Sequence, residues 1–547
     1  MRWLDARLSH LSLRGSLLPQ LFLLAFTLVM ILPGFFALPP VDRDETRFAQ
    51  ASRQMVESGD YVDIRLGEET RYKKPVGIYW LQSAALTFVG AEEHAQDIWA
   101  YRLPSALAAL CSVLLTYGIA RRLIGPEGAL LAGAVLAVGF VFGAEARLAK
   151  TDATLLACLL LSQWALARLW VGEGLSRGAA ALFWLGLALS ILVKGPMGLM
   201  VVGSTLIVLI ALRCDLRWLA DLRPLSGLAI LAIVVLPWFL AITVHSGGAF
   251  WQEALGKDLL AKVGQGQESH GAPPGSYLLA VWVTFWPGAM LLPFAGLMVW
   301  RGWRSPAVTF CLAWLVPSWL VFELTATKLV HYVLPTYPAL AILCAAGWLA
   351  HLERAPQAGW RRPILLVLLA LGAVFPVAGA YAALQFGGSL TLHWGLGLGL
   401  FGLGTYVIWQ SLATGARMAP LLGFGLLSLG MSLSVFANLA RVPQLWPSVA
   451  LAEAIETSPC AAPQVLVLGY EEASLRLLSP VPITFSGDLA KSLQDQDRAR
   501  CTLILAEDAT ETQLGPEFEQ ITRVEGFSIG SAKTLRFSLY LRRAARG

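Results

Sequence analysis

The sequence contains few charged residues, and this shortage excludes an ordinary soluble protein. Only 14% of the 547 residues are Asp, Glu, Lys or Arg, whereas 56% are hydrophobic. A soluble protein of this size carries roughly 25% charged residues. The net charge of +5 is small for this length, so the positions of the charges matter more than their sum. We expect no nucleic acid among the partners of this chain.

Several site motifs are also missing from the sequence. It has no HxH or HExxH spacing, and such spacings are typical of zinc sites. It has no Gly-rich loop of the P-loop type and no evident nucleotide-sugar motif. We therefore expect that no cofactor is required. A structural zinc assembled from separate loops stays open, with His270 and His331 as candidate metal ligands.

Long apolar runs fill most of residues 1–440. They predict an all-α polytopic membrane protein with about thirteen transmembrane helices, because only helices and closed barrels can span a bilayer. The expected spans are residues 15–38, 98–122, 127–144, 153–171, 178–194, 197–212, 224–245, 277–300, 306–326, 332–350, 363–385, 391–411 and 418–440. The run 76–90 is apolar but short, so we expect a helix along the membrane surface. If it spans instead, every later segment changes side.

The arginine residues indicate how the chain is oriented. With the N-terminus in the cytoplasm, the inner face receives 16 of the 23 arginines in residues 1–440, Arg121 and Arg122 among them. Cytoplasmic loops of membrane proteins carry such an excess of positive charge. This orientation places the first loop, residues 39–97, and the loop 246–275 outside. The second of these is rich in Gly and Pro, and it is either a mobile lid or an ordinary connection.

The tail, residues 441–547, has a different character and falls outside the membrane in this orientation. Strand-like runs occur at 464–470, 481–485, 501–506 and 535–541, with helical stretches near 472–478 and 488–499. This alternation predicts a small C-terminal α/β domain. Cys460 and Cys501 both fall in it. They either form a disulfide, if the compartment is oxidising, or remain two buried thiols.

Four outer segments carry the polar side chains that could form a site. In the first, the acidic pair Asp44 and Glu45 follows the first apolar run, and Arg47 stands three residues after Asp44. We take Asp44 and Glu45 as candidate catalytic acids and Arg47 as a candidate ligand of a lipid phosphate. The alternative for Asp44 is a plain helix N-cap.

Two of the other outer segments also combine cations with an acid. Lys74 lies in the first loop, and a lysine there either binds phosphate or anchors the chain at the lipid interface. Arg147, Lys150 and Asp152 lie at an outer helix junction. We expect Asp152 to be a catalytic acid, unless it is only an N-cap. We expect Lys74, Arg147 and Lys150 to bind the phosphate of a donor.

The last outer segment is KLVHYVLPTY, residues 328–337. Lys328, Tyr332 and Tyr337 are candidates for binding the donor phosphate. His331 stands between Lys328 and Tyr332, so it either faces an anion or is an ordinary hydrogen-bonded histidine.

Several motifs together resemble the GT-C superfamily of polyprenyl-phosphate-sugar-dependent glycosyltransferases. They are the acidic pair 44–45, the Lys-Pro and Tyr-Trp pairs within 74–80, YRLPS at 101–105, KTDAT at 150–154 and KLVHYVLP at 328–335. The resemblance covers most of residues 1–440. Within its protein mannosyltransferase-like branch, the chain resembles the bacterial lipid A aminoarabinose transferases.

This resemblance implies a multi-pass enzyme of the bacterial inner membrane that works at the periplasmic face. It would take 4-amino-4-deoxy-L-arabinose from undecaprenyl phosphate and attach it to the phosphate groups of lipid A in lipopolysaccharide, which confers resistance to polymyxin. By resemblance, Asp44 matches the first-loop acid, Asp152 the second acid and Lys74 the cation near the donor phosphate. Arg47, Tyr332 and Tyr337 are weaker matches.

Two other functions remain open at this point. A related transferase would glycosylate protein hydroxyls or envelope glycans from a similar lipid-linked sugar. A lipid transporter is less favoured, because it would need charges along a path through the spans, and the candidate charges gather at one face. The residues leave open whether the acid acts as a base or stabilises charge on the sugar.

Overall fold

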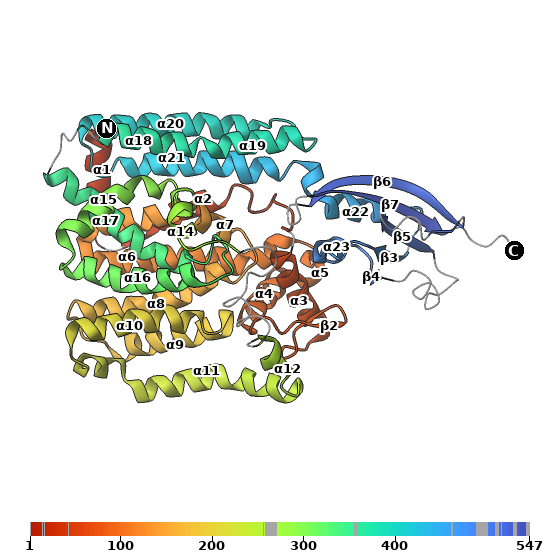
Figure 1. Cartoon of the computed structure of the whole chain (residues 1–547), viewed down its shortest axis with the longest axis horizontal. Coiled ribbons are helices and arrows are strands. Elements are labelled where there is room, and N and C mark those ends of the chain that lie inside the picture. The colour runs from red at the N-terminus through yellow and green to blue at the C-terminus, as the bar shows by residue number, and fades with distance from the viewer. Residues whose placement is uncertain are drawn as a thin grey trace.

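The computed structural model describes residues 2–13, 15, 17–41, 43–254, 256, 271–354, 359, 361–460, 463–487, 501–508, 514–515, 517–528 and 533–542. Long helices lie side by side, and a small sheet with two short helices forms one end of the molecule (Figure 1). The fold class is as predicted, with a helical membrane part and a C-terminal α/β domain.

Most helices of the membrane part follow the apolar runs. Their bounds are α1 (Arg2–Leu13), α2 (Leu17–Ile31), α6 (Ile98–Ala137), α7 (Phe140–Ala146), α8 (Asp152–Trp170), α9 (Arg177–Lys194), α10 (Met197–Arg213), η1 (Arg217–Leu222), α11 (Pro224–His245), α12 (Ala249–Trp251), α14 (Ser276–Thr284), η3 (Gly288–Leu291), α15 (Leu292–Gly302), α16 (Pro306–Leu324), η4 (Leu334–Thr336), α17 (Tyr337–Arg354), α18 (Arg361–Gly372), α19 (Val374–Gln385), α20 (Leu392–Thr414), α21 (Pro420–Ser432) and η5 (Leu433–Ala437).

The described part of the chain contains eight apolar helices long enough to cross a bilayer, or up to ten if each of two bent pairs forms one span. The chain is therefore a multi-pass membrane protein. The count of about thirteen spans stays a prediction.

Some predicted spans are shorter or broken in the structure. The span expected at 277–300 consists of α14, η3 and α15, and the chain bends by 111° between its two halves. Pro287 lies at this break, where it cannot donate a backbone hydrogen bond to continue the helix. The first span ends at Ile31 and not at residue 38, because Pro33 and Gly34, with φ of +83°, turn the chain there.

The first outer loop folds into short elements at the same end as the C-terminal domain (Figure 1). They are α3 (Asp44–Ser58), β1 (Arg65–Leu66), β2 (Glu69–Thr70), α4 (Gly77–Val89) and α5 (Ala91–His94). The run 76–90 is thus the helix that the sequence predicts. Its 13 residues reach about 20 Å, which is less than the roughly 30 Å of a bilayer core.

The C-terminal domain contains a five-stranded sheet of order β4-β3-β5-β7-β6. Its elements are η6 (Pro443–Leu445), α22 (Pro447–Glu456), β3 (Gln464–Leu468), α23 (Ala473–Leu478), β4 (Ile483–Ser486), β5 (Thr502–Glu507), β6 (Phe518–Ser528) and β7 (Lys533–Arg542). β3 pairs in parallel with β4 and β5, while β7 runs antiparallel to β5 and β6. A disulfide joins Cys460 to Cys501. The sequence did not predict β6, and the helix expected at 488–499 lies outside the described residues.

Helix α23 docks the C-terminal domain onto the first outer loop. The side chain of Leu477 is fully buried in a cluster that includes Ala49 of α3 and Ala149. Arg53 donates a hydrogen bond of 3.2 Å to the carbonyl of Leu477, and Gln96 donates one of 2.9 Å to that of Ser479. The domain therefore holds α3, which begins with the first of the candidate acids.

Candidate active site

Asp44 is the first residue of α3, and its side chain is exposed. Arg43 occupies the N-cap position, and no side chain caps the helix. The Asp44 carboxylate makes no hydrogen bond to any residue that the structure describes. The structural alternative of an N-cap role for Asp44 is therefore not observed, and the carboxylate is available to a ligand.

Cations surround the Asp44 carboxylate. Partial burial disfavours its charged form and by itself raises its pKa, but Lys150, Arg71, His331 and Lys74 together outweigh this effect. The pKa of Asp44 is consequently lower than its ordinary value, as expected for a carboxylate beside positive charge. Asp44 is thus ionised at neutral pH and faces a field that attracts anions.

A buried cluster of alternating charges lies next to Asp44. Lys150 donates a hydrogen bond of 3.0 Å to Oε1 of Glu145, and Lys194 donates one of 2.5 Å to Oδ1 of Asp152. The His331 ring lies between the two acids, with Nδ1 3.5 Å from Glu145 and Nε2 3.8 Å from Asp152. The four charged groups and His331 come from α7, α8, α9 and two connecting segments.

Burial sets the protonation of this cluster. It raises the pKa of Glu145 to about 7, although Lys150 opposes the shift. It lowers the pKa of His331 to about 3, against the attraction of Asp152. His331 is therefore neutral at neutral pH, whereas Glu145 can change its protonation state in that range.

Glu145 also has unused hydrogen-bonding capacity. Its Oε2 atom is buried and has no hydrogen-bond partner among the described residues. A buried polar atom without a partner costs free energy, and in a native structure it often marks a place where a ligand or water binds. Glu145 is therefore the carboxylate of this cluster that keeps an unused acceptor atom.

An aromatic ring covers the second ion pair. The Lys194 ammonium lies 5.3 Å from the centre of the Tyr332 ring, within the range of a cation–π interaction. The rings of His331 and Tyr332 meet edge to face at 5.2 Å. Tyr332 thus belongs to the cluster through its ring.

Glu45 forms a closed clasp with Arg102. The carboxylate accepts two hydrogen bonds from Arg102, at 2.8 and 3.0 Å, and one each from the backbone N–H groups of Ala149 and Val41. The remaining Arg102 donors bind the carbonyls of Phe35, Leu38 and Pro39. The side chains are 1% and 0% exposed. The geometry therefore favours a structural role for Glu45 over the catalytic role that the sequence suggested.

Arg147 is likewise committed to the protein. Its guanidinium donates to the carbonyls of Met30, Pro33 and Gly143 and to the Ser432 hydroxyl. It also stacks on Phe436 at 4.6 Å. Arg147 is buried, so it stabilises the end of the first span and is poorly placed to bind a donor phosphate.

The other candidates differ in how close they lie to the cluster. Lys74 is among the cations that face Asp44. Lys328 donates to the carbonyl of Thr325 at 2.6 Å, and the buried Tyr337 hydroxyl pairs with Thr284 at 2.5 Å. Arg47 faces Glu472 of the C-terminal domain. Tyr337 and Arg47 therefore have partners outside the cluster.

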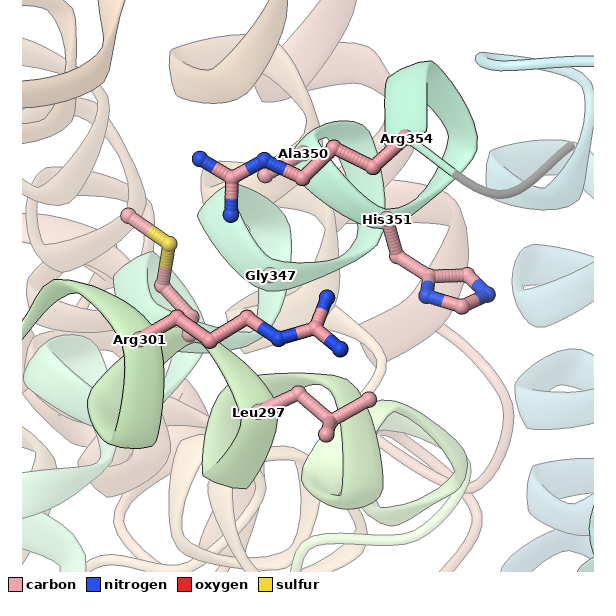
Figure 2. A pocket seen from close by; sticks show the side chains of 7 residues that line it. Leu297, Arg301, Gly347, Ala350, His351 and Arg354 are labelled. Atoms are coloured by element: carbon pink, nitrogen blue, oxygen red, sulfur yellow. The ribbon is translucent and has the colours of Figure 1, made fainter.

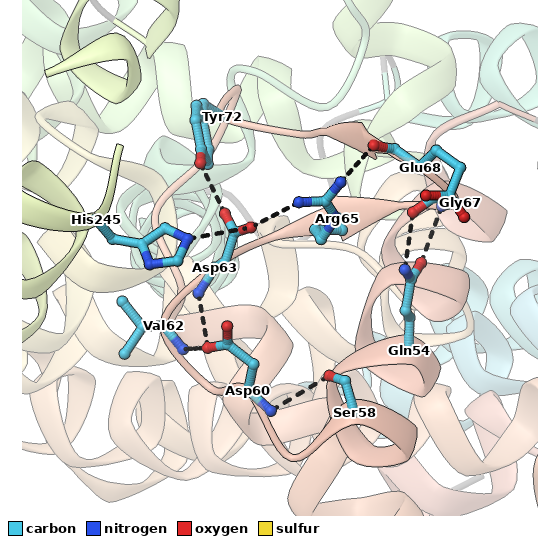
Figure 3. Close-up of polar contacts among 10 residues, drawn as sticks. All are labelled: Gln54, Ser58, Asp60, Val62, Asp63, Arg65, Gly67, Glu68, Tyr72 and His245. Atoms are coloured by element: carbon cyan, nitrogen blue, oxygen red, sulfur yellow. Dashed lines mark hydrogen bonds and ion pairs between the residues drawn. The ribbon is translucent and has the colours of Figure 1, made fainter. Parts of the chain in front are cut away.

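A network of polar contacts orders the part of the first loop that carries Arg71 and Lys74 (Figure 3). Asp63 accepts a hydrogen bond of 2.7 Å from the Tyr72 hydroxyl and one of 3.3 Å from Arg65. Its carboxylate also lies 3.5 Å from Nε2 of His245 at the end of α11. These contacts fix the loop against α11.

The predicted metal ligands do not gather in the described part of the chain. His270 lies outside the described residues. Among the residues that the structure describes, no group of three or more His, Cys, Asp or Glu side chains could hold a metal ion. His331 instead lies between Glu145 and Asp152.

Sequence reasoning missed three members of the site. Glu145 stands two residues before Arg147, but its spacing from Lys150 and Asp152 fits no periodic pattern. Lys194 ends an apolar helix and precedes Gly195-Pro196, which is the only local signal that it carries. Arg71 lies in a loop where no pattern predicts which cation faces Asp44.

The sequence has recognisable relatives. Residues 73–240 match a family model described as dolichyl-phosphate-mannose-protein mannosyltransferase. An undecaprenyl phosphate-alpha-4-amino-4-deoxy-L-arabinose arabinosyl transferase from Edwardsiella ictaluri is 32% identical over 337 residues, which cover 58% of each chain. A protein of the same name from Pseudomonas paraeruginosa is 31% identical over 371 residues, covering 64% of this chain and 65% of that one. This chain thus spans less than two thirds of either relative.

A solved structure matches almost the whole fold. The crystal structure of ArnT from Cupriavidus metallidurans bound to undecaprenyl phosphate has a TM-score of 0.75 and 18% identity. The match covers 96% of this chain and 98% of that one. It therefore includes the membrane part and the C-terminal domain, and shows that the two proteins share a fold.

Proposed function

We propose that this chain is a lipid-linked-sugar-dependent glycosyltransferase. The proposal starts from the premise that the chain is an ArnT-like membrane protein of the GT-C superfamily. The enzyme transfers 4-amino-4-deoxy-L-arabinose from undecaprenyl phosphate to phosphate groups of lipid A. The reaction takes place at the periplasmic face of the bacterial inner membrane, with the N-terminus in the cytoplasm.

Two kinds of similarity support this proposal. The names of the two curated relatives state the donor lipid and the sugar. The structural match was determined with undecaprenyl phosphate bound. The lipid A acceptor is part of the proposal and rests on the resemblance of the sequence motifs to lipid A aminoarabinose transferases.

The observation that carries the proposal is the free Asp44 carboxylate beside Lys150, Arg71 and Lys74. Displacement at the anomeric carbon needs an anion stabiliser for the departing phosphate and a carboxylate near the sugar. Cations positioned in advance stabilise the leaving phosphate as it gains charge. Lys74, Arg71 and Lys150 are suited to this task.

The acceptor requires little activation. The second pKa of a phosphate monoester is about 6, so a lipid A phosphate is largely ionised at neutral pH. It can attack the anomeric carbon without a general base, and the bond to undecaprenyl phosphate breaks as the new bond forms. Asp44 then stabilises the positive charge that develops on the sugar ring, as carboxylates do in glycoside hydrolysis.

Glu145 and Asp152 are suited to different tasks. Asp152 is held by Lys194 at 2.5 Å, so its charge is already balanced. Glu145 has a buried oxygen atom with no partner among the described residues. We therefore assign the ammonium group of the sugar to Glu145, as the second carboxylate beside Asp44.

A protein hydroxyl is the second candidate acceptor, as the name of the matching family model suggests. A hydroxyl needs a general base, and such a base works best when its pKa lies near the working pH. Glu145, with a pKa raised to about 7, has this property. This observation keeps the second function testable.

A transport function is less well supported. Glu323 lies within the candidate span α16, and it accepts hydrogen bonds from the backbone N–H groups of Gly275, Tyr277 and Leu278 and from Trp319. Its role is to hold the start of α14. A carboxylate with four donors is not poised to bind a passing substrate.

The deciding experiment weighs lipid A by mass spectrometry after incubation with undecaprenyl-phosphate-aminoarabinose and the purified protein. We expect the mass of one aminopentose to be added, and we expect Asp44→Asn to abolish the addition. Glu57→Gln is the matched control, because Glu57 lies on the same helix, is exposed and forms its ion pair with Arg53.

Each outcome has a distinct meaning. Addition by the wild type and by Glu57→Gln but not by Asp44→Asn supports both the reaction and the role of Asp44. Near-normal turnover by Asp44→Asn contradicts that role. No addition by the wild type, followed by transfer to a hydroxyl acceptor, would establish the second function.

A further inference from the structure

The ends of α15 and α17 form a small cationic hollow. It is lined by Leu297, Met298, Arg301, Gly347, Ala350, His351 and Arg354. The side chains of Arg301 and Arg354 both line this hollow and lie on either side of Gly347 in the view of Figure 2. The hollow has a volume of about 10 Å³, which is roughly the space that one water-sized group requires. One oxygen of a phosphate group fits there.

Gly347 allows α15 and α17 to pack closely beside the hollow. A Cβ atom at Gly347 would lie 2.2 Å from the carbonyl oxygen of Phe294, so only glycine lets α17 pack this closely on α15. The close crossing brings the last turn of each helix, with its arginine, to one place. His351 packs against Phe294 below them, with a ring distance of 5.1 Å.

The two arginines lack counter-ions among the described residues, unlike several of their neighbours at this face. Arg122 and Arg168 share Glu173, and Arg417 pairs with Glu127 and Glu353. No described acid lies in an ion pair with Arg301 or Arg354. Two like charges that line one hollow repel each other, and an anion between them reduces the repulsion.

The helix ends alone do not account for this arrangement. The C-terminus of a helix carries partial negative charge and favours one nearby cation. That effect explains an arginine at each helix end, but it acts on each helix separately. It does not require both arginine side chains to line the same hollow.

The hollow lies at the membrane interface opposite the candidate active site. α17 begins at Tyr337, next to the cluster around His331, and its 18 residues carry the chain about 27 Å to Arg354. Trp300 and Trp303, on and beside the last turn of α15, are 84% and 57% exposed. Exposed tryptophans at a helix end are typical of the level of lipid headgroups.

We propose that Arg301 and Arg354 bind the phosphate of an anionic lipid in the leaflet opposite the active site. Two guanidinium groups bind a phosphate through paired hydrogen bonds with good geometry. Basic pockets between helices on the cytoplasmic side recognise anionic headgroups in this way. The site is independent of the proposed transferase reaction, and it ties the α15–α17 corner to the surrounding bilayer.

The test measures lipid retention by native mass spectrometry on the full chain in nanodiscs. The probe lipids are phosphatidylglycerol and phosphatidylcholine in equal amounts. We expect the wild type to retain phosphatidylglycerol preferentially, and the double variant Arg301→Gln/Arg354→Gln to lose that preference by roughly tenfold, because two charge-assisted contacts disappear. Arg177→Gln is the matched control, since Arg177 is an exposed arginine at the same face outside the hollow.

A second arm identifies the source of the phosphate. Inorganic phosphate is added to protein in the mixed nanodiscs and, separately, to protein in nanodiscs of phosphatidylcholine alone. If inorganic phosphate does not displace bound phosphatidylglycerol, the result supports a lipid site. If inorganic phosphate binds and the double variant loses this binding, the result supports a site for free phosphate and overturns the lipid assignment. Equal retention by the double variant and by Arg177→Gln, or no lipid preference in the wild type, overturns the proposal. All three positions are exposed, so each variant is expected to fold.

Discussion

Two buried ion-pair groups beside the first loop differ in how fully their hydrogen bonds are used. In the Glu45–Arg102 clasp, the carboxylate accepts four hydrogen bonds and the guanidinium binds three carbonyls in addition. In the Glu145–Asp152 cluster, Glu145 keeps a buried oxygen with no partner among the described residues. The neighbouring Asp44 carboxylate is also free of hydrogen bonds to them.

The comparison teaches that burial of charge does not by itself mark a functional site. The clasp has no group left for a ligand, so its role is to hold the first outer loop against α6. The Glu145–Asp152 cluster can gain hydrogen bonds from a bound substrate. The two groups therefore differ in their unused hydrogen-bonding capacity and not in charge alone.

The largest expected effect concerns the clasp. Glu45→Gln should lower the free energy of unfolding by about 3–5 kcal/mol, because Arg102 stays buried without its counter-ion and cannot lose its proton. Thermal unfolding of the purified protein in detergent checks this. Transfer per folded molecule should stay close to that of the wild type. A stable but inactive Glu45→Gln protein would contradict the distinction between the two groups.

The cluster should respond in the opposite way. Lys150→Gln should reduce turnover by about 10²–10³-fold, because one cation that stabilises the departing phosphate is lost. Its stability should change little, since Glu145 can bind a proton when Lys150 is absent. The pKa of Asp44 should rise, because Lys150 is the cation that lowers it most.

The measurement is a rate profile against pH for Lys150→Gln. The acid limb of the profile should move to higher pH if ionised Asp44 is required. Lys73→Gln is the control, because Lys73 is exposed and is not one of the cations that affect the pKa of Asp44. Equal losses of turnover in the two variants would mean that only general positive charge matters.

The sequence was sufficient for the membrane class and for the end of the molecule where the site lies. Apolar length and the composition of the tail predict a helical bundle with an α/β domain, and the structure has both. The sequence did not predict the break at Pro287. The apolar run continues on both sides of this proline, so hydropathy alone does not reveal a turn that depends on tertiary packing. Strand β6 was missed because six of its 11 residues are polar and only one residue is buried.

The site itself was only partly accessible to sequence reasoning. Asp44 and Asp152 follow apolar runs, and this position is visible in the sequence. The roles of Glu45 and Arg147 depend on which carbonyls the turn at Pro33 and Gly34 leaves free, and no local pattern records that. Lys194 meets Asp152 across 42 residues, so only the fold shows the pair.

A smaller effect is expected from Glu145, and it depends on pH. The ordinary pKa of 4.5 is raised to about 7 in the folded chain, so Glu145 ionises as the pH rises through 7. If the carboxylate pairs with the sugar ammonium, activity should rise over that interval. Glu145→Gln should remove this rise and leave turnover about tenfold lower above pH 7.

Stability gives an independent check on Glu145. Between pH 4.5 and about 7 the folded chain keeps a proton that the unfolded chain has released. The free energy of unfolding should therefore fall as the pH rises through this interval, and Glu145→Gln should remove that part of the slope. Asp60→Asn, in an exposed turn of the first loop, should retain it. If the free energy of unfolding of Glu145→Gln depends on pH as in the wild type, a group other than Glu145 binds the proton.

The smallest expected effect tests whether the ring of Tyr332 belongs to the cluster. Tyr332→Leu removes the cation–π contact with Lys194, which is worth about 0.5–2 kcal/mol, so KM for the donor should rise several-fold. Tyr332→Phe keeps the ring and should stay close to the wild type. If Tyr332→Phe loses as much as Tyr332→Leu, the hydroxyl is the active group.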